Sequence, residues 1–320
     1  MNKKHGIVVV GSTNVDLVAR VAHLPLPGET VGNTDYTTTY GGKGANQAIA
    51  AARAGGDVVF VTNLGDDSYG SALIPYFRDN AISSEFLFVE QNTPTGVAII
   101  LVADSGENCI AVAPGANQML ANDKIERIHA AIEQAEYLLL QMEIPYTSVA
   151  SLIDYAYRAG TRIVLNPAPA MPLDPELLRK ISLLILNETE AETISGLRLA
   201  EHDPAILAEQ LHRMGPETII LTLGASGAYI CSSTIRRSVQ AFRVKAVDTT
   251  AAGDTFCGAL TAQLTRTHDL LDAVKYATAA AALAVTKLGA QPSIPDRQAV
   301  EQFLETHCAP ILEMIKKTGI

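Results

Sequence analysis

The sequence has few cysteines, and no two of them form a paired motif. Cys109, Cys231, Cys257 and Cys308 lie far apart, with no Cys-x-x-Cys spacing. Structural zinc sites and disulfide frameworks both depend on grouped cysteines. We therefore expect neither, and we interpret these residues as reduced thiols of a cytoplasmic protein.

Clusters of basic residues are also absent, and the net charge at pH 7 is −10. Because proteins bind nucleic acids through Lys and Arg side chains that neutralise phosphates, we expect no nucleic-acid partner. A single nucleotide is compatible with this charge, since backbone N–H groups at a helix start bind phosphates without a basic surface.

Long hydrophobic runs are missing as well. The first apolar run, Ile7–Val10, is too short for the core of a signal peptide. The longest, Tyr276–Thr286, is mostly alanine and lies between Lys275 and Lys287. A membrane-spanning helix needs about 20 apolar residues, so we expect no membrane association.

The residues that are present favour an α/β fold with a large core. Hydrophobic residues make up 48% of the 320 residues and charged residues 18%, which excludes a disordered chain. Short runs that are apolar at nearly every position are typical of parallel strands covered on both faces. The predicted strands are Ile7–Val10, Val58–Val61, Tyr137–Leu140, Arg162–Leu165, Leu183–Leu186 and Thr218–Thr222. The predicted helices are Ala45–Ala54, Ser71–Asn80, Asn122–Gln134, Tyr146–Ala159 and Ala205–Met214. Their alternation predicts a three-layer α/β/α sandwich with a mostly parallel central sheet.

Two segments interrupt this alternation. Leu17–Thr39 has β-type residues without a helical period, and Gly96–Val112 holds two apolar runs around a turn-rich stretch, which indicates a hairpin. We predict that they form a small accessory sheet, which acts either as a lid beside a cleft or as an extension of the sheet edge.

The first candidate site is Gly41–Ala48, Gly-Gly-Lys-Gly-Ala-Asn-Gln-Ala, at the start of a predicted helix. Glycines there let a ligand approach the helix amides closely. The segment is not a Walker A loop, because Lys43 is followed by Gly44, and the chain has no Gly-x-Gly-x-x-Gly fingerprint of a dinucleotide-binding enzyme. A plain tight turn is the alternative.

The second candidate site is Asp248–Phe256, Asp-Thr-Thr-Ala-Ala-Gly-Asp-Thr-Phe, which precedes a predicted helix reaching about Leu264. Small residues at a helix start leave N–H groups free to bind an anion. An aspartate in the same turn suits a base that takes a proton from a hydroxyl attacking a phosphate. An ordinary N-cap aspartate is the alternative.

These two motifs resemble the signatures of the ribokinase (PfkB-type) family, which also contains fructokinases, adenosine kinases and the minor bacterial phosphofructokinase. Further segments resemble the family in the same order, and the resemblance covers residues 7 to about 295. These segments are Gly11-Ser12-Thr13-Asn14-Val15-Asp16, Pro27-Gly28-Glu29-Thr30, Gly65-Asp66-Asp67, Asn166-Pro167-Ala168-Pro169, Asn187-Glu188-Thr189-Glu190, Thr222–Gly227 and Gly289–Ser293. The resemblance implies one ribokinase-like kinase domain over residues 1–320, with the lid at 17–39 and 96–112.

The resemblance implies that the protein is an ATP-dependent kinase acting on the 5-hydroxyl of D-ribose. Asp254 matches the catalytic base of the family, and the amides of Ala251, Ala252, Gly253 and Asp254 match its anion hole. The residues that match the sugar site are Asn14, Asp16, Gly42, Lys43, Asn46 and Glu143. Plainer alternatives are an Asx turn at Asn14–Asp16 and a solvated Lys43. A carboxylate at the end of an apolar strand, such as Glu143, needs a partner, which a sugar hydroxyl or a lysine could supply.

The resemblance also implies sites for ATP and two cations. Asn187 and Glu190 match a motif that orders Mg²⁺ through water, although a helix capping box gives the same pattern. Residues that match the nucleotide site are Asn187, Thr222, Leu223, Gly224, Ala225, Ser226, Gly227, Gly253 and Thr278. Residues that match the K⁺ site of the family are Asp248, Thr250, Ala284, Lys287, Gly289 and Ser293.

Two departures from the family affect the nucleotide side: Cys257 replaces the usual Asn, and Thr278 stands where some members have His. Family members with such a lid often pair lid to lid, so we expect a homodimer, with Val18, Val21, Leu24, Ile100 and Val102 as candidate contacts. Other substrates remain open, namely 2-deoxyribose, fructose or a nucleoside, as does a sugar sensor without catalysis. Such a sensor predicts a damaged base or anion hole, yet Gly253 and Asp254 are both present.

Overall fold

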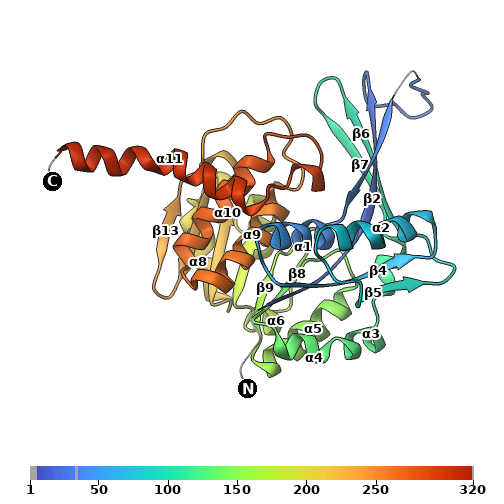
Figure 1. The fold of residues 1–320 in the computed structure, drawn as a ribbon, viewed down its shortest axis with the longest axis horizontal. Coiled ribbons are helices and arrows are strands. Elements are labelled where there is room, and N and C mark those ends of the chain that lie inside the picture. Colours follow the sequence, from blue (N-terminus) through green and yellow to red (C-terminus); the bar gives the residue numbers. More distant parts are fainter. Residues whose placement is uncertain (1–5, 33–34, 319–320) are drawn as a thin grey trace.

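The computed structural model describes residues 6–32 and 35–318, without the side chains of Asn122 and residues 308–318. A nine-stranded sheet runs through the molecule in the order β13-β12-β11-β10-β9-β8-β1-β4-β5 (Figure 1). Its parallel strands are β1 (Ile7–Val10), β4 (Val58–Gly65), β5 (Leu87–Glu90), β8 (Tyr137–Leu140), β9 (Arg162–Leu165), β10 (Leu183–Leu186) and β11 (Thr218–Thr222). Two antiparallel strands, β12 (Ala228–Ser232) and β13 (Arg236–Val239), complete one edge. The predicted mostly parallel sheet is confirmed.

Helices cover both faces of this sheet, and the strands are apolar because each face needs its own core. In β1, Ile7 and Val9 join one hydrophobic cluster, whereas Val8 and Val10 join the other. The first cluster packs under α1 (Lys43–Arg53), α2 (Ser68–Asp79), α9 (Ala252–Thr267), α10 (Leu270–Ala284) and the start of α11 (Arg297–Thr318). The second packs under α3 (Asn122–Arg127), α4 (His129–Gln134), α5 (Tyr146–Ala159), α6 (Pro175–Leu178), α7 (Glu188–Ser195) and α8 (Pro204–Arg213).

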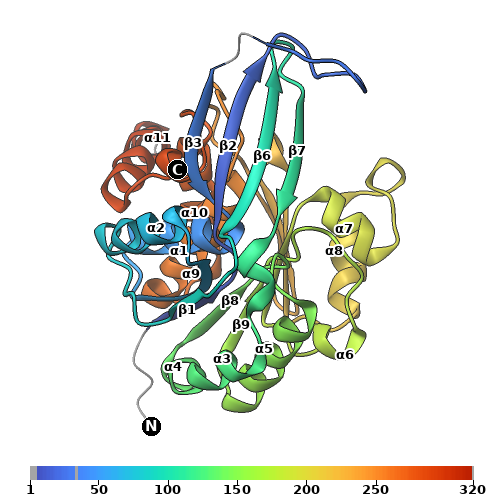
Figure 2. The ribbon, with the colours of Figure 1, turned by 90° about the vertical axis from the view of Figure 1, so that its right-hand side faces the viewer.

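A separate four-stranded sheet stands beside the body, in the order β3-β2-β6-β7 (Figure 2). Its strands are β2 (Asn14–Val21), β3 (Tyr36–Gly41), β6 (Gly96–Ala103) and β7 (Asn108–Ala113). The predicted accessory sheet therefore exists, but its first strand begins at Asn14 instead of Leu17. Two residues of the predicted segment, Asn33 and Thr34, lie outside the described residues.

The pairing of β2 with β6 shows which residues share a face of the small sheet. Asp16 lies opposite Ala98, and Val18 lies opposite Ile100. Because side chains alternate between faces, Asp16, Val18 and Ile100 share one face, and Val21 belongs to the other. The candidate dimer contacts therefore do not form a single surface, which corrects the sequence-based grouping.

The predicted helix over Asn122–Gln134 is wrong in one respect, because it consists of two helices. Ile128 has φ −101° and ψ 1°, ends α3 and precedes α4. Its fully buried side chain joins the same core cluster as those of Ile125 and Ile132. The break between the two helices therefore lies at a residue whose side chain is packed in the core.

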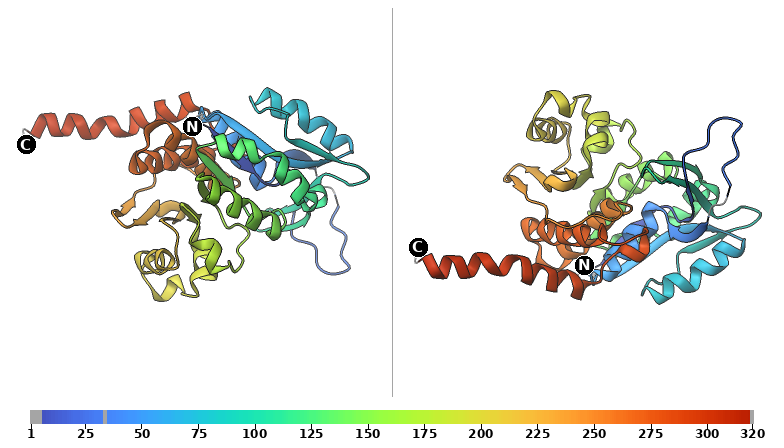
Figure 3. Two further views of the ribbon diagram at one scale, coloured as in Figure 1. Left: turned by 90° about the horizontal axis from the view of Figure 1, so that it is seen from below. Right: turned by 90° about the horizontal axis from the view of Figure 1, so that it is seen from above.

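The structure also contains elements that were not predicted from the sequence, among them β5, β12, α7, α10 and α11. The helix α1 begins at Lys43, so part of the glycine-rich motif is helical, and α11 extends away from the body in both views of Figure 3. Among the described residues, no helix combines the length and the apolar character needed to cross a membrane. The thiols of Cys109, Cys231 and Cys257 are free, and the side chain of Cys308 lies outside the described part.

Candidate active site

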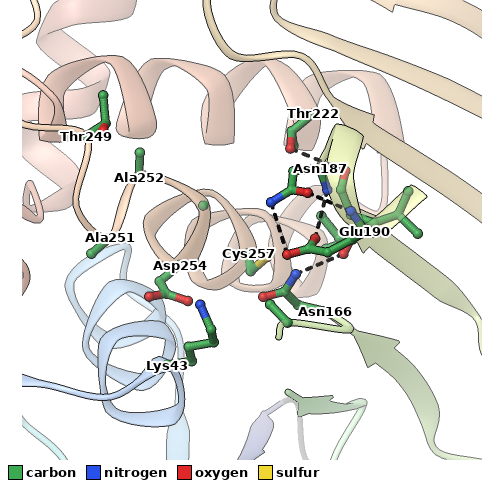
Figure 4. Close-up of a pocket in the computed structure, with 14 residues that line it drawn as sticks. Lys43, Asn166, Asn187, Glu190, Thr222, Thr249, Ala251, Ala252, Asp254 and Cys257 are labelled. Atoms are coloured by element: carbon green, nitrogen blue, oxygen red, sulfur yellow. Dashed lines mark hydrogen bonds between the residues drawn. The ribbon is translucent and has the colours of Figure 1, made fainter. Parts of the chain in front are cut away.

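Many of the predicted site residues lie near the carboxyl ends of the parallel strands, where ligands bind in open α/β sheets. A cavity of about 220 Å³ opens there, between the start of α9 and the ends of β9, β10 and β11 (Figure 4). The residues that line it are Lys43, Asn166, Ala168, Ile185, Leu186, Asn187, Glu190, Thr222, Thr249, Ala251, Ala252, Gly253, Asp254 and Cys257.

The start of α9 has the features of an anion site. Ala251 adopts a left-handed conformation with φ 58°, and no side chain caps the helix. The amide of Ala252 donates to the carbonyl of Thr249 at 3.2 Å, so it is less available than predicted. The amides of Gly253 and Asp254, in the first turn, can bind an anion in the cavity.

Asp254 lies in this first turn, only 7% exposed, and both of its carboxylate oxygens accept a hydrogen bond from a side-chain amide. Asn46 donates to Oδ2 at 2.9 Å and Gln47 donates to Oδ1 at 2.9 Å. An ordinary N-cap role is excluded, because the carboxylate does not cap α9. Asn46 was predicted from the sequence as a sugar-site residue, whereas Gln47 was not predicted as a site residue.

Lys43 lines the cavity, and its side chain points toward Asp254 (Figure 4). Burial lowers the pKa of this ammonium, but the nearby carboxylates of Asp254, Glu143 and Glu190 outweigh burial and raise it. Lys43 is therefore a charged group of the site and not a solvated surface lysine.

Asn14 and Asp16 lie on β2, so the alternative of an Asx turn is wrong. Gly42, with φ 88°, brings the start of α1 against this strand, and a Cβ there would lie 2.7 Å from the amide nitrogen of Asn14. Asp16 is 8% exposed. Burial, together with the charges of Glu143 and Asp254, raises the pKa of its carboxyl to about 7.

Asn117 supports Asn14 and was missed by the sequence analysis. It lies in the 3-10 helix Gly115–Met119 and is 2% exposed. Its Nδ2 donates to Oδ1 of Asn14 at 2.8 Å and to the carbonyl of Thr13 at 3.1 Å, and its Oδ1 accepts from the amide of Thr13 at 2.9 Å. Because the oxygen of Asn14 is engaged, Asn14 presents its NH₂ group to a ligand.

Glu143 follows β8 and has protein partners that differ from those considered from the sequence. One of its oxygens accepts from the hydroxyl of Ser12 at 2.5 Å and from the backbone amide of Lys43 at 3.0 Å. The carboxylate therefore joins the loop after β1 to the start of α1, in addition to any contact with a sugar.

Asn187 and Glu190 form the capping box at the start of α7. Asn187 donates to Glu190 through its backbone amide at 2.8 Å and through its side chain at 3.0 Å. Burial raises the pKa of the Glu190 carboxyl despite these bonds. The capping role is thus present, and both residues still line the cavity. Among the described side chains, no group of three or more His, Cys, Asp or Glu could hold a metal ion.

Other residues predicted for the nucleotide are only partly gathered at the cavity. Thr222 lines it, and Gly224–Ser226 form a 3-10 turn directly after β11. Thr278 is buried in α10, where its hydroxyl donates to the carbonyl of Val274 at 2.8 Å. It does not belong to the cavity lining.

The residues predicted for K⁺ join two loops beside the start of α9. Oδ1 of Asp248 accepts from the amide and the hydroxyl of Thr250 at 2.9 and 2.6 Å, and Oδ2 accepts from the amide of Gly289 at 2.9 Å. Burial tends to raise the pKa of Asp248, but these hydrogen bonds outweigh it and lower the pKa. Ser293 donates to the carbonyl of Ala290 at 2.7 Å.

Comparison with known proteins identifies the family to which this chain belongs. Residues 4–297 match the model of the pfkB family of carbohydrate kinases. The chain is 42% identical over 300 residues to a ribokinase from Haemophilus influenzae, an alignment that covers 93% of this chain and 98% of the relative.

Solved structures agree with this match. A ribokinase structure from Thermotoga maritima is 37% identical, with a TM-score of 0.87 and coverage of 94% of this chain and 99% of the other. An Arabidopsis thaliana ribokinase, determined with ribose and ATP, is 30% identical, with a TM-score of 0.86 and coverage of 94% and 98%. The chain therefore belongs to the pfkB family of carbohydrate kinases.

Proposed function

We propose that this protein transfers the terminal phosphoryl group of ATP to the 5-hydroxyl of D-ribose, giving ribose 5-phosphate and ADP. The observation that carries the proposal is the position of Asp254, a buried carboxylate in the same helix turn as the open amides of α9. The ribokinases to which the chain is similar, one of them determined with ribose and ATP, support the choice of sugar and donor.

The proposed sugar site joins β2 and α1. Asn14 offers hydrogen-bond donors, and Asp16 offers acceptors when it is ionised. Asn46 adds a buried Oδ1 that has no hydrogen-bond partner among the described residues, although its Nδ2 is bonded to Asp254. A buried acceptor without a partner is costly, and a sugar hydroxyl would satisfy it. Gly42, Lys43 and Glu143 complete the set.

In the proposed reaction, the carboxylate of Asp254 takes the proton of the sugar hydroxyl as the oxygen attacks phosphorus. A bond forms between that oxygen and the terminal phosphorus, the bond to the β-phosphate oxygen breaks, and ADP leaves with its electron pair. The amides of Gly253 and Asp254, with the ammonium of Lys43, stabilise the negative charge of the transferring group.

We assign the ATP phosphates to the described cavity, beside Asn187, Glu190 and Thr222. Glu190 is the one carboxylate among the lining residues besides Asp254. It fits a hydrated Mg²⁺, which commonly keeps several waters and uses few protein carboxylates. When bound, Mg²⁺ neutralises phosphate charge. Because the proposed donor is ATP, we place the enzyme in the cytoplasm.

We assign K⁺ to the paired loops held by Asp248. The hydrogen bonds that lower the pKa of Asp248 keep it ionised, and carbonyl-rich loops suit a weakly hydrated cation. Bound K⁺ would hold the 248–250 loop at the start of α9. We expect turnover in KCl to exceed turnover in NaCl at equal ionic strength, and equal rates would contradict this assignment.

We further propose that the small sheet is a lid over the sugar and pairs with a second copy of the chain. Both faces expose apolar side chains, among them Ile99 at 52% on one face and Ile110 at 53% on the other. An open small sheet is marginal in water alone. Sedimentation of the wild type, Ile99→Asp and Ile110→Asp will show a dimer that one change disrupts. A monomeric wild type would refute the pairing.

One assay tests the substrate directly. ADP release is measured with ATP and Mg²⁺ on D-ribose, 2-deoxyribose, fructose and a nucleoside, at matched sugar concentrations. We expect the highest kcat/KM with ribose, because a site that hydrogen-bonds a hydroxyl disfavours an analogue that lacks it. A higher value with another sugar would replace ribose as the substrate, and no ADP release with any sugar would favour a sensor.

A further inference from the structure

Gln47 lies directly beside Asp254 and has no solvent exposure. Its Nε2 uses both hydrogens, donating to Oδ1 of Asp254 at 2.9 Å and to Oδ1 of Asn166 at 3.1 Å. Its Oε1 accepts from Nε2 of Gln141 at 2.6 Å. The whole amide group is therefore engaged, and one of its bonds ends on the proposed base.

The orientation of this amide follows from one backbone carbonyl. Asn166 donates through Nδ2 to the carbonyl of Ile185 at 3.0 Å. Its Oδ1 therefore faces Gln47, so Gln47 must present Nε2 there and toward Asp254. The remaining oxygen of Gln47 then requires a donor, which Gln141 supplies.

Two glycines allow close packing around this group. Gly11 leaves the space that Gln141 occupies, because a Cβ at position 11 would lie 2.0 Å from its Oε1. Gly258 lets α9 approach α1, because a Cβ there would lie 2.3 Å from the carbonyl oxygen of Gln47. The same contact sets the distance between Asp254 and the side chain of Gln47.

We propose that Gln47 is the positioning residue of Asp254, held in place by Gln141 and Asn166. The proposal rests on the proposed function, in which Asp254 is the base. A neutral amide orients the carboxylate through a hydrogen bond, without supplying the positive charge that an ion pair would. Asn46 bonds the other oxygen, but it also belongs to the sugar site, so Gln47 is the contact dedicated to the base.

The experiment compares Gln47→Leu, Gln141→Leu, Asp254→Asn and Thr161→Val. Thr161 is a buried control remote from the cavity, whose hydroxyl donates to the carbonyl of Ile132 at 2.7 Å. For each variant, kcat and both KM values are measured with ribose and ATP, and kcat is followed from pH 5 to pH 9. Melting temperatures show the loss of stability.

For Gln47→Leu we expect kcat to fall roughly 10- to 100-fold, because a misplacement of about 1 Å can cost about 100-fold. Both KM values should change little. The pH profile of kcat should differ from that of the wild type, because a hydrogen bond to the carboxylate is lost. The titratable groups that also face Asp254 are Asp16 on β2, Lys43 on α1, Glu190 on α7 and Cys257 on α9.

Gln141→Leu should show the same changes to a smaller degree. If Gln47→Leu does not fold, Gln141→Leu tests the positioning role in its place. Thr161→Val should lose stability without any change in the pH profile. Unchanged kcat and pH profile in both glutamine variants, with Asp254→Asn inactive, would overturn the positioning role alone. Substantial turnover by Asp254→Asn would instead overturn the assignment of the base.

Discussion

The tetrapeptide Gly-Ala-Asn-Gln occurs twice in this chain, at residues 44–47 and 115–118, and the side chains of its two copies bond to different partners. In the first copy, Asn46 and Gln47 are buried in α1 and both donate to Asp254. In the second, Asn117 is buried in a 3-10 helix and bonds to Thr13 and Asn14. Gln118 of the second copy is exposed.

In both copies the local sequence supplies the hydrogen-bond donors, whereas tertiary packing determines their acceptors. Both alanines, Ala45 and Ala116, are fully buried, so each tetrapeptide packs closely on its neighbours. The first copy continues into a helix that packs on α9, which brings Asp254 within reach of two consecutive amides. The second copy lies in a 3-10 helix that ends at Met119, and its Asn117 bonds to Asn14 on β2. The first copy therefore contacts the proposed base, and the second contacts the proposed sugar site.

The largest expected effect tests whether Asp254, to which the first copy donates, is the catalytic base. Asp254→Asn should lower kcat by about 10² to 10⁴-fold, the usual range for loss of a general base. Binding of ATP and ribose, measured by calorimetry, should persist, because the amides of α9 and the residues on β2 remain. Turnover close to that of the wild type would show that Asn46 and Gln47 do not hold a base.

The next effect tests whether the second copy serves binding. In Asn117→Asp, the new carboxylate cannot donate to Asn14, so Asn14 must turn its NH₂ group away from the sugar. We expect the KM for ribose to rise roughly 5- to 100-fold, corresponding to about 1–3 kcal/mol for a buried group left without a partner. The kcat at saturating ribose should change little.

Gln47→Leu and Asn117→Asp should differ in the kinetic constant that they change. Gln47→Leu, in the first copy, should lower kcat, whereas Asn117→Asp, in the second copy, should raise the KM for ribose. Steady-state kinetics of Asn117→Asp with ribose as the varied substrate will separate the two. A fall in kcat without a rise in KM would show that both copies act on the same step, and the comparison would fail.

Much of the fold could be predicted because its central strands are buried on both sides. Parallel strands such as Leu183–Leu186 must be apolar at every position, which makes them visible in one sequence. β13, with Arg236 and Arg237, was missed because an edge strand carries exposed polar residues. The break at Ile128 was missed because the hydrophobic period continues through it.

The candidate site was only partly predictable for a related reason. Motifs identified Asp254 and Asn46, but Gln141 and Asn117 act through partners 94 and 104 residues away in the chain. No local pattern encodes such a contact. The repeated tetrapeptide was the one available signal, because it places a second Asn in a context like that of Asn46.

A smaller effect concerns Asp16, which stands on β2 between the partners of the two copies. Its pKa of about 7 means that folding favours the protonated carboxyl. This contribution to stability is full below about pH 4 and is lost as the pH rises through about 7. Asp16→Asn should therefore be more stable than the wild type at pH 8 without sugar, by at most about 4 kcal/mol in the free energy of unfolding.

The advantage of Asp16→Asn should vanish near pH 4, where both proteins carry a neutral side chain. Thermal unfolding at the two pH values gives the comparison, with the Asp35→Asn protein as a control for the loss of one charge. An equal difference at both pH values would mean that the effect comes from packing and not from titration. Ribose affinity of Asp16→Asn should fall, because the carboxylate acceptor is gone.

The smallest expected effect concerns Gln118, the counterpart of Gln47 in the second copy. Gln118→Leu makes the same substitution as Gln47→Leu, but at an exposed position. Exposed substitutions usually change stability by no more than about 0.5 kcal/mol, so we expect kcat, KM and the pH profile of the wild type. If Gln118→Leu instead lowered kcat as Gln47→Leu does, the effect would come from the tetrapeptide itself and not from contact with Asp254. Kinetic measurements on Gln47→Leu and Gln118→Leu, made in parallel, therefore show whether the glutamine of the tetrapeptide affects kcat only where it contacts Asp254.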